Sequence, residues 1–256
     1  MIYARYMKDG EERWGWIEDQ RVGLVVGDPF GEHTRGPKTA DLSNITLLAP
    51  CRPTKVVSVS NNFLGRAQEL GVALPAVPQV ILKPPSAVAG PDQPILLPPQ
   101  SGEVEHEAEL AVVMGRSARW VAPEDALAYI LGYTCANDVT ARDLQRADVQ
   151  MTRAKAFDTF CPLGPWLVTG LDPADLVIFC SVNGQVRQMT STREMAFTVP
   201  QLVAFVSSVM TLEPQDVILC GTPAGVGPLR DGDLVEIEIE GIGRLSNPVV
   251  QPPTET

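Results

Sequence analysis

The segment that most constrains this chain is residues 103–115, which begins acidic and continues without a break as an apolar strand-like run. Side chains alternate between the two faces of an extended strand, so Glu105, Glu107 and Glu109 would share one face and His106 the other. Carboxylates this close together raise one another's pKa unless a cation lies between them. Two interpretations follow: a site for a hard divalent ion such as Mg²⁺ or Mn²⁺, or an exposed acidic strand edge.

Length and composition exclude several classes of protein. The chain has 256 residues, with 45% hydrophobic and 20% charged residues, which is typical of a globular protein with a substantial core. Its net charge of −11 disfavours nucleic acid and anionic membrane surfaces as partners. The first residues lack the pattern of a signal peptide, and no apolar run reaches the length of a membrane span. We therefore expect a cytoplasmic protein.

The cysteines and histidines argue against two kinds of catalytic site. The five cysteines are scattered and form no C-x-x-C pair, which indicates reduced thiols that serve mainly in packing. The chain has only two histidines, His33 and His106. A zinc site of clustered cysteine and histidine is therefore disfavoured, and so is a cysteine nucleophile activated by histidine.

The order of the predicted elements indicates an α+β protein that is mainly β. Short alternating runs between turn residues predict a small β-rich N-terminal domain over residues 1–50, with a loop at 28–44. Residues 51–256 form the second predicted domain, with helices near 123–132 and 198–209 among several strands. Within it, a short helix and a proline-rich stretch make up residues 62–92, which predict either a lid over a site or an ordered connection.

Several motifs, in the same order along the chain, resemble the fumarylacetoacetate hydrolase family over residues 54–249. They are Glu107-Ala-Glu-Leu-Ala-Val-Val-Met-Gly, Gly132-Tyr-Thr, Asn137-Asp-Val-Thr-Ala-Arg-Asp-Leu-Gln, Lys155-Ala-Phe-Asp-Thr-Phe-Cys-Pro-Leu-Gly-Pro, Asn183-Gly-Gln-Val-Arg-Gln, Gly221-Thr-Pro-Ala-Gly-Val-Gly and Gly241-Ile-Gly-Arg-Leu-Ser-Asn. The resemblance implies a mixed β-roll or barrel in the larger domain, a metal site at its open end, and a homodimer.

The resemblance also assigns roles to individual residues. The family's metal ligands fall on Glu107, Glu109 and Asp138, with Mg²⁺ or Mn²⁺ as the implied cofactor. Lys155 matches the family's active-site lysine, and Gln145 and Thr222 match positions that touch the substrate. Without the resemblance, Lys155 could equally be a surface lysine and Thr222 a turn residue ahead of a proline.

The implied chemistry explains why these residue types occur together. Family substrates are 2-oxo or β-diketo acids, whose C1 carboxylate and C2 oxygen can chelate one divalent ion. The ion is a Lewis acid that stabilises an enolate, and a lysine adds a second positive charge beside the developing oxyanion. C–C hydrolysis, decarboxylation and enol–keto isomerisation all pass through that enolate.

One departure from the family pattern separates these reactions. Hydrolytic members carry a His-x-x-Glu pair whose histidine activates water, whereas this chain has Arg66 at the histidine position and retains Glu69. Arginine stays protonated and cannot act as a general base. It could instead pair with Glu69, one helical turn away, or clamp a second substrate carboxylate.

We therefore predict a Mg²⁺-dependent isomerase or decarboxylase of an unsaturated 2-oxo or 2-hydroxy diacid in aromatic-compound catabolism. Glu69 is the expected proton shuttle and Arg66 the expected ligand of the distal carboxylate. One alternative is a C–C bond hydrolase of acylpyruvates or fumarylacetoacetate-like substrates, in which Glu69 alone positions water. Another is an inactive metal- or ligand-binding protein, against which the intact Lys155 argues.

Overall fold

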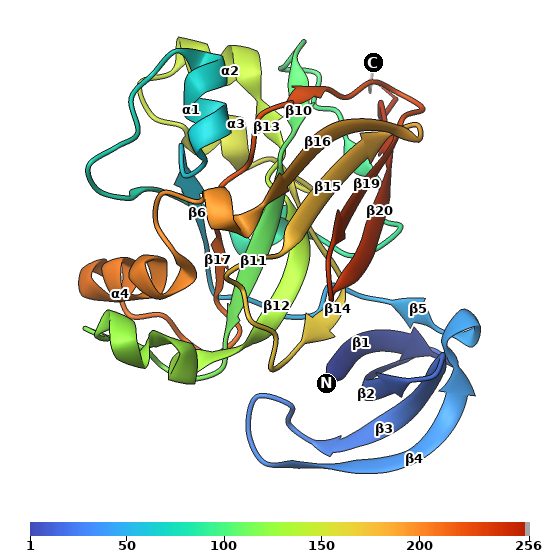
Figure 1. The fold of residues 1–256 in the computed structure, drawn as a ribbon. Helices are drawn as coiled ribbons and strands as arrows, with labels where there is room; N and C mark the ends of the chain where they lie inside the picture. Colours follow the sequence, from blue (N-terminus) through green and yellow to red (C-terminus); the bar gives the residue numbers. More distant parts are fainter. Residues whose placement is uncertain (254–256) are drawn as a thin grey trace.

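Strands dominate this computed structural model, which describes residues 1–253, and the larger sheets form a β-roll (Figure 1). The largest sheet has the order β4 (His33–Asp41), β3 (Arg21–Gly27), β2 (Glu11–Glu18), β1 (Ile2–Lys8), β14 (Cys161–Val168), β12 (Ile130–Asn137), β11 (Ala108–Met114), β17 (Val217–Leu219), β6 (Val56–Ser60), β7 (Gln79–Lys83). Two short strands join it, β5 (Thr46–Leu47) beside β1 and β8 (Val88–Ala89) beside β14.

A second sheet faces the first, and a small third sheet lies at one end of the roll. The second has the order β16 (Gln185–Ser191), β15 (Val177–Val182), β19 (Leu234–Ile239), β20 (Gly243–Val250), β9 (Ile95–Leu96). The third joins β13 (Thr140–Ala141), β10 (Val104–His106) and β18 (Gly227–Pro228). The helices are α1 (Leu64–Leu70), α2 (Arg142–Ala147), α3 (Thr152–Lys155) and α4 (Val199–Val209), with short 3₁₀ helices at Leu42–Asn44, Pro85–Ala87, Pro123–Tyr129 and Thr192–Glu194.

The core lies between the two large sheets, where β11, β12 and β14 pack against β15, β19 and β20. Every residue of β11 is buried, as expected of an apolar run covered on both faces. Leu110 and Val112 from this strand belong to the same apolar cluster as Ile178 and Ile237 from the facing sheet. The prediction of an α+β protein that is mainly β is confirmed.

The N-terminal strands form an antiparallel meander, drawn in blue in Figure 1, that extends the largest sheet. β1 joins the meander to β14, with Ile2 opposite Val168. The prediction of a loop over residues 28–44 is wrong, because β4 pairs with β3 along most of that stretch. β4 is a largely exposed edge strand, so its sequence is polar and lacks the apolar alternation that marks a half-buried strand.

The helix predicted at 123–132 is shorter than expected, and its C-terminal part is a strand. A 3₁₀ helix covers Pro123–Tyr129, and β12 starts at Ile130. An apolar run that continues from a helix into a buried strand has no periodicity break to mark the boundary. The helix predicted at 198–209 is confirmed as α4, which begins with a capping box between Thr198 and Gln201.

Residues 62–92, predicted as either a lid or an ordered connection, are more regular than their prolines suggest. They contain α1, β7 and β8, and β7 pairs antiparallel with β6, with Ser58 opposite Ile81. Among the residues described, the structure contains no helix with the length and apolar character needed to cross a membrane.

Asp216 connects the starts of β6 and β17 through hydrogen bonds, and its removal is expected to destabilise the fold. The fully buried carboxylate accepts hydrogen bonds from Thr54 N and Oγ1 (2.9 and 2.8 Å) and Glu213 N (2.7 Å), and it pairs with Lys55. Asp216→Ala removes these hydrogen bonds to a charged group together with the pair to Lys55, and should lower the free energy of unfolding by about 3 kcal/mol. Urea titration measures this loss; Glu238→Ala, which removes an exposed ion pair, should change stability by less than about 1 kcal/mol.

Candidate active site

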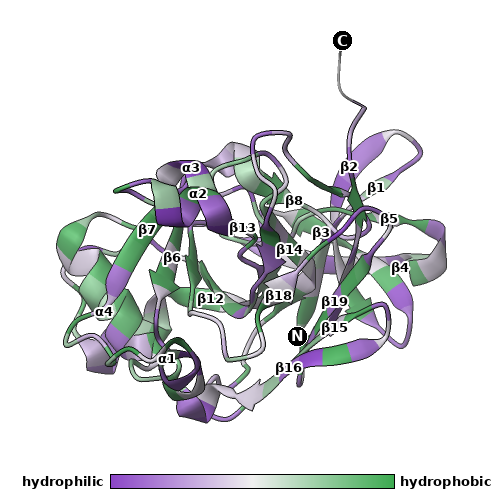
Figure 2. Ribbon diagram, turned by 90° about the horizontal axis from the view of Figure 1, so that it is seen from above, coloured by the Kyte–Doolittle hydropathy of each residue, from purple (hydrophilic) through white to green (hydrophobic). Residues whose placement is uncertain are grey.

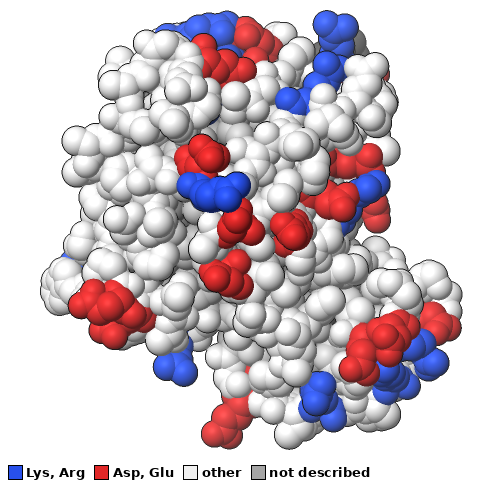
Figure 3. All heavy atoms as spheres, viewed as in Figure 1, with Lys and Arg blue, Asp and Glu red and all other residues white. Residues whose placement is uncertain are grey.

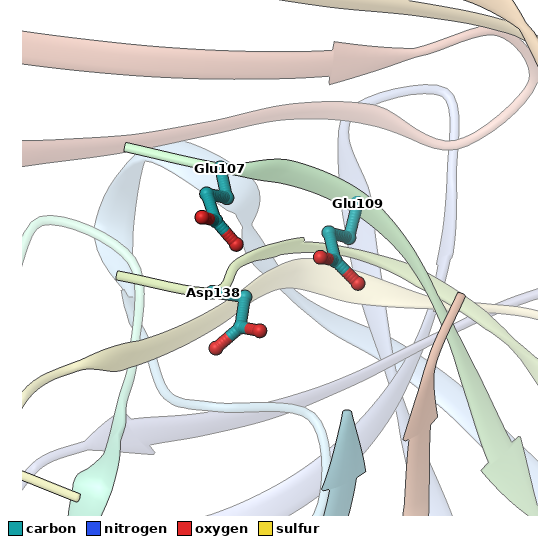
Figure 4. A group of neighbouring side chains, drawn as sticks. All are labelled: Glu107, Glu109 and Asp138. Atoms are coloured by element: carbon teal, nitrogen blue, oxygen red, sulfur yellow. The ribbon is translucent and has the colours of Figure 1, made fainter. Parts of the chain in front are cut away.

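Three buried carboxylates converge at one end of the roll (Figure 4). Glu107 lies just before β11, Glu109 lies within it, and Asp138 follows β12 directly. β11 and β12 are antiparallel neighbours, with Ala108 opposite Asn137, so their ends place the three side chains together. Each side chain offers an oxygen atom, and these atoms all lie within 4.8 Å of one another. The structure thus brings together the three predicted metal ligands.

The acidic segment is less regular than a single strand. β10 ends at His106 and β11 begins at Ala108, so the strand is interrupted at Glu107. Glu105 does not join the cluster as alternation predicted; it pairs with Arg142 Nε at 2.6 Å. His106 is buried with Nδ1 3.1 Å from Gln188 Oε1. The burial of Glu107 and Glu109 excludes the alternative of an exposed acidic edge for these two residues.

Two buried lysines contact the carboxylates. Lys155 Nζ donates to Glu107 Oε2 (2.8 Å), Asp138 Oδ2 (2.6 Å) and the Asp138 carbonyl oxygen (3.1 Å). Lys83 Nζ donates to Asp138 Oδ1, and Ser58 Oγ donates to Asp138 Oδ2. The structure places Lys155 against the acidic cluster, where its role in catalysis stays a prediction, and adds Lys83 and Ser58 to the site.

The charges of the site are unevenly balanced. Burial opposes ionisation of Asp138, but Lys155 and Lys83 outweigh it and hold the pKa of this carboxyl well below its usual range. Burial likewise opposes ionisation of Glu107, but Lys155 and Arg142 lower its pKa. For Glu109, burial and the negative charge of Asp138 dominate and raise the pKa well above its usual range, although Gly221 N donates to Oε2 at 2.6 Å.

The three carboxylates and the raised pKa of Glu109 fit a site for a divalent cation. Three carboxylates from adjacent strand ends offer the hard oxygen ligands that Mg²⁺ and Mn²⁺ prefer. A cation beside Glu109 would remove the electrostatic cost that raises its pKa. For Lys155, burial disfavours the charged form, but Asp138 and Glu107 outweigh it and raise the pKa, so this side chain stays an ammonium.

Glu107 and Asp138 line a cleft of about 350 Å³. Seen from above, α1 lies on one side of this end of the molecule and α2 and α3 on the other, with β6, β12 and β13 between them (Figure 2). Arg66 and Leu70 line the cleft from α1, and Gln145 and Arg146 line it from α2. Lys155 lines it from α3, and Ile81 from β7. Four cationic side chains, Arg66, Arg142, Arg146 and Lys155, therefore face a space of the size that small-molecule sites usually have.

Comparison with known proteins decides the family. Residues 55–250 match the family described as Fumarylacetoacetate (FAA) hydrolase C-terminal, and residues 1–50 match the one described as Rv2993c-like, N-terminal. The chain belongs to the fumarylacetoacetate hydrolase family. This match confirms the family resemblance that the sequence motifs indicated.

Two curated relatives align with most of the chain. Protein Rv2993c of Mycobacterium tuberculosis is 50% identical over 246 residues, which cover 95% of this chain and 92% of that protein. The mitochondrial oxaloacetate tautomerase FAHD2A of Bos taurus is 46% identical over 221 residues, covering 81% of this chain and 70% of that protein.

Solved structures of the fumarylacetoacetate hydrolase family match the fold closely. The 2-hydroxyhepta-2,4-diene-1,7-dioate isomerase of Mycobacterium marinum has a TM-score of 0.93 at 44% identity, covering 99% of this chain and 100% of that one. The maleylpyruvate hydrolase of Sphingobium sp. SYK-6, in complex with manganese(II) and pyruvate, has a TM-score of 0.82 at 32% identity, with coverages of 99% and 100%.

The pair that departs from the family's hydrolytic pattern is an ion pair at the cleft. Arg66 Nη1 contacts Glu69 Oε2, as the spacing along α1 predicted. Glu69 Oε1 also accepts a hydrogen bond from Gly225 N at 3.0 Å, so this carboxylate ties α1 to the loop that carries Thr222. Within residues 1–253, no histidine lines the cleft. His33 lies in the N-terminal strands, 2.8 Å from Tyr3 Oη.

The two predicted substrate contacts both line the cleft, and both have partners within the protein. Gln145 Oε1 accepts from Arg142 Nη1. The Thr222 hydroxyl donates to the Ala108 carbonyl oxygen (3.0 Å) and accepts from Gln188 Nε2 (2.9 Å). Donation from Thr222 to a substrate, as predicted, therefore requires this hydroxyl to give up its bond to Ala108.

The five cysteines have the packing role that the sequence predicted. All five cysteines are buried, and burial raises the pKa of Cys161 and Cys180 to about 12, so these thiols are not activated. On the face shown in Figure 3, basic and acidic side chains are scattered or paired and form no broad basic patch.

Proposed function

We propose that this enzyme catalyses enol–keto isomerisation of a short unsaturated 2-oxo or 2-hydroxy diacid, with Mg²⁺ or Mn²⁺ as cofactor. The observation that carries the proposal is the buried cluster of Glu107, Glu109 and Asp138 beside the ammonium of Lys155, at a cleft that presents Arg66 and no histidine. Both oxaloacetate and 2-hydroxyhepta-2,4-diene-1,7-dioate, named in relatives, have a carboxylate at each end and an oxygen at C2.

The acidic cluster is the proposed ligand set of the metal. Glu107, Glu109 and Asp138 would hold the ion, and Lys83 and Ser58 support it by fixing both oxygens of Asp138. When bound, the ion supplies Lewis-acid catalysis to a substrate oxygen.

Lys155 is the proposed donor to the oxygen that becomes negative during enolisation. It stays protonated, so it acts as a cationic hydrogen-bond donor and not as a base. Its three N–H groups have acceptors on Glu107 and Asp138. A substrate oxygen would therefore replace one of these protein acceptors, which places the substrate directly against the acidic cluster.

The pair of Arg66 and Glu69 is proposed to serve the other end of the substrate. Arg66 lines the cleft and offers a planar, permanently charged fork that suits a distal carboxylate. Glu69 is the candidate proton carrier, because its carboxylate stands beside Arg66 on α1. The lack of a histidine at the cleft favours isomerisation over C–C hydrolysis, which requires a base to activate water.

Ultraviolet spectroscopy tests this function directly. The enol of oxaloacetate absorbs where the keto form does not, so ketonisation can be followed with protein and Mg²⁺, with Mg²⁺ alone, and after EDTA. We expect acceleration over Mg²⁺ alone that EDTA removes and added Mg²⁺ or Mn²⁺ restores. A rate equal to that of Mg²⁺ alone, for oxaloacetate and for a 2-hydroxydienoate diacid, would refute the proposal.

Arg66→Met is expected to weaken the binding of diacid substrates selectively. Loss of the guanidinium should raise KM for oxaloacetate by about 10- to 100-fold, the size of one charged hydrogen-bonded contact, with a smaller change in kcat. For a 2-oxo acid without a distal carboxylate, KM should change little. Arg153→Met is the matched control, since Arg153 pairs with Asp148 outside the cleft. Equal effects on both substrates would contradict the role of Arg66.

A further inference from the structure

Side-chain amides accept hydrogen bonds from the backbone N–H groups where the acidic segment is interrupted. At the break between β10 and β11, Glu107 N donates to Asn137 Oδ1 at 2.9 Å, and Ala108 N donates to Gln188 Oε1 at 3.0 Å. Backbone N–H groups buried at such a break need partners from elsewhere. Gln188 supplies one from β16, a strand of the facing sheet.

The Gln188 amide is 1% exposed and uses both of its ends. Besides accepting from Ala108 N, Oε1 lies 3.1 Å from His106 Nδ1. Nε2 donates to Thr222 Oγ1 and to the Pro223 carbonyl oxygen, both at 2.9 Å. The side chain thus connects the acidic segment to the loop that carries Thr222.

These contacts close a ring around Ala108. Ala108 N donates to Gln188, Gln188 donates to Thr222, and the Thr222 hydroxyl donates back to the Ala108 carbonyl oxygen at 3.0 Å. Both polar groups of the Ala108 backbone are therefore held by side chains. Ala108 lies between the two glutamates of the cluster, so its orientation determines where Glu107 and Glu109 point.

We infer that Gln188 is a positioning residue that holds Glu107 and Glu109 in the arrangement that binds the divalent cation. The inference rests on the proposed function, since it assumes the cation. Gln188 does not touch the carboxylates; it acts through the backbone of Ala108 and through Thr222. Partners that orient metal ligands in this way typically change metal affinity by about 10- to 100-fold when removed.

The test is the affinity of the substrate-free protein for Mn²⁺, measured by electron paramagnetic resonance of the free ion. Gln188→Met keeps the size of the side chain and removes its hydrogen bonds, and should raise the Mn²⁺ dissociation constant by about 10- to 100-fold. Asn247→Leu is the matched control: Asn247 is equally buried and donates to the carbonyl oxygens of Gly90 and Gln93 (2.9 and 2.8 Å), outside the cluster. It should lower the melting temperature and leave Mn²⁺ affinity unchanged.

A second variant keeps the test decisive if Gln188→Met does not fold. Thr222→Val breaks the ring at its hydroxyl and should weaken Mn²⁺ binding by less than Gln188→Met does. A residue that only touches substrate would leave substrate-free Mn²⁺ binding unchanged. Circular dichroism establishes that each variant is folded before its Mn²⁺ affinity is compared with that of the wild type.

The outcomes separate this inference from the proposed function. If the wild type binds no Mn²⁺, the metal site itself is wrong and the inference fails with it. If the wild type binds Mn²⁺ and folded Gln188→Met binds it equally well, the positioning role is wrong and the metal site stands. If only Thr222→Val can be measured, an affinity for Mn²⁺ equal to that of the wild type would show that the ring of hydrogen bonds around Ala108 does not position the ligands.

Discussion

Glu109→Gln is expected to abolish Mn²⁺ binding and lower kcat by at least about 10³-fold, the scale of a lost Lewis acid. The amide removes the negative charge of a fully buried ligand while Gly221 N still has an oxygen to donate to. Burial and Asp138 raise the pKa of Glu109, so the neutral variant should be at least as stable as the wild type without metal. Mn²⁺ titration, kcat and thermal melting measure these three effects.

Glu103→Gln is the control for this prediction. Glu103 belongs to the same acidic segment but pairs with Arg146, which contacts none of the three carboxylates, so its amide should leave Mn²⁺ binding intact. Retained Mn²⁺ binding in Glu109→Gln would show that the cluster is not the metal site. Equal losses in both variants would instead point to the net charge of the segment.

The second large effect is expected from Lys155→Met, which should lower kcat by about 10²- to 10³-fold, the usual cost of one donor to a developing oxyanion. Mn²⁺ should still bind, because an apolar side chain leaves the oxygens of Glu107 and Asp138 free of the ammonium. Lys155→Met should lose activity and keep Mn²⁺ binding, whereas Glu109→Gln should lose both. Steady-state kinetics and Mn²⁺ titration measure the two properties. Lys38→Met, in the N-terminal strands beside Glu18, is the control. A kcat within tenfold of the wild type would contradict the role of Lys155.

The parts of the site that depend on local geometry were predictable from the sequence. Glu107 and Glu109 are two residues apart near the start of a buried strand, and a motif of the family resemblance added Asp138, which directly follows the adjacent strand. Arg66 and Glu69 are three residues apart on α1, and their ion pair follows from helical spacing. In each case the information lies within a few residues of the site.

The parts that depend on distant segments were not predictable in the same way. Lys83 reaches Asp138 because β7 pairs with β6, and that pairing is hidden in a proline-rich stretch without clear alternation. The interruption at Glu107 is held in part by Gln188, about 80 residues away on the facing sheet. The edge strand β4 is too polar to show a strand pattern. Tertiary contacts, and not local preference, determine all three.

Proton NMR of the purified protein with Mg²⁺ tests the central claim most directly. Oxaloacetate, a 2-hydroxydienoate diacid and an acylpyruvate are each offered with and without EDTA, so that ketonisation, loss of CO₂ and C–C cleavage are seen in one experiment. We predict ketonisation of a diacid that EDTA stops, with the acylpyruvate left intact. Cleavage of the acylpyruvate to pyruvate and a carboxylic acid would show that the enzyme hydrolyses C–C bonds despite Arg66, and would contradict the account.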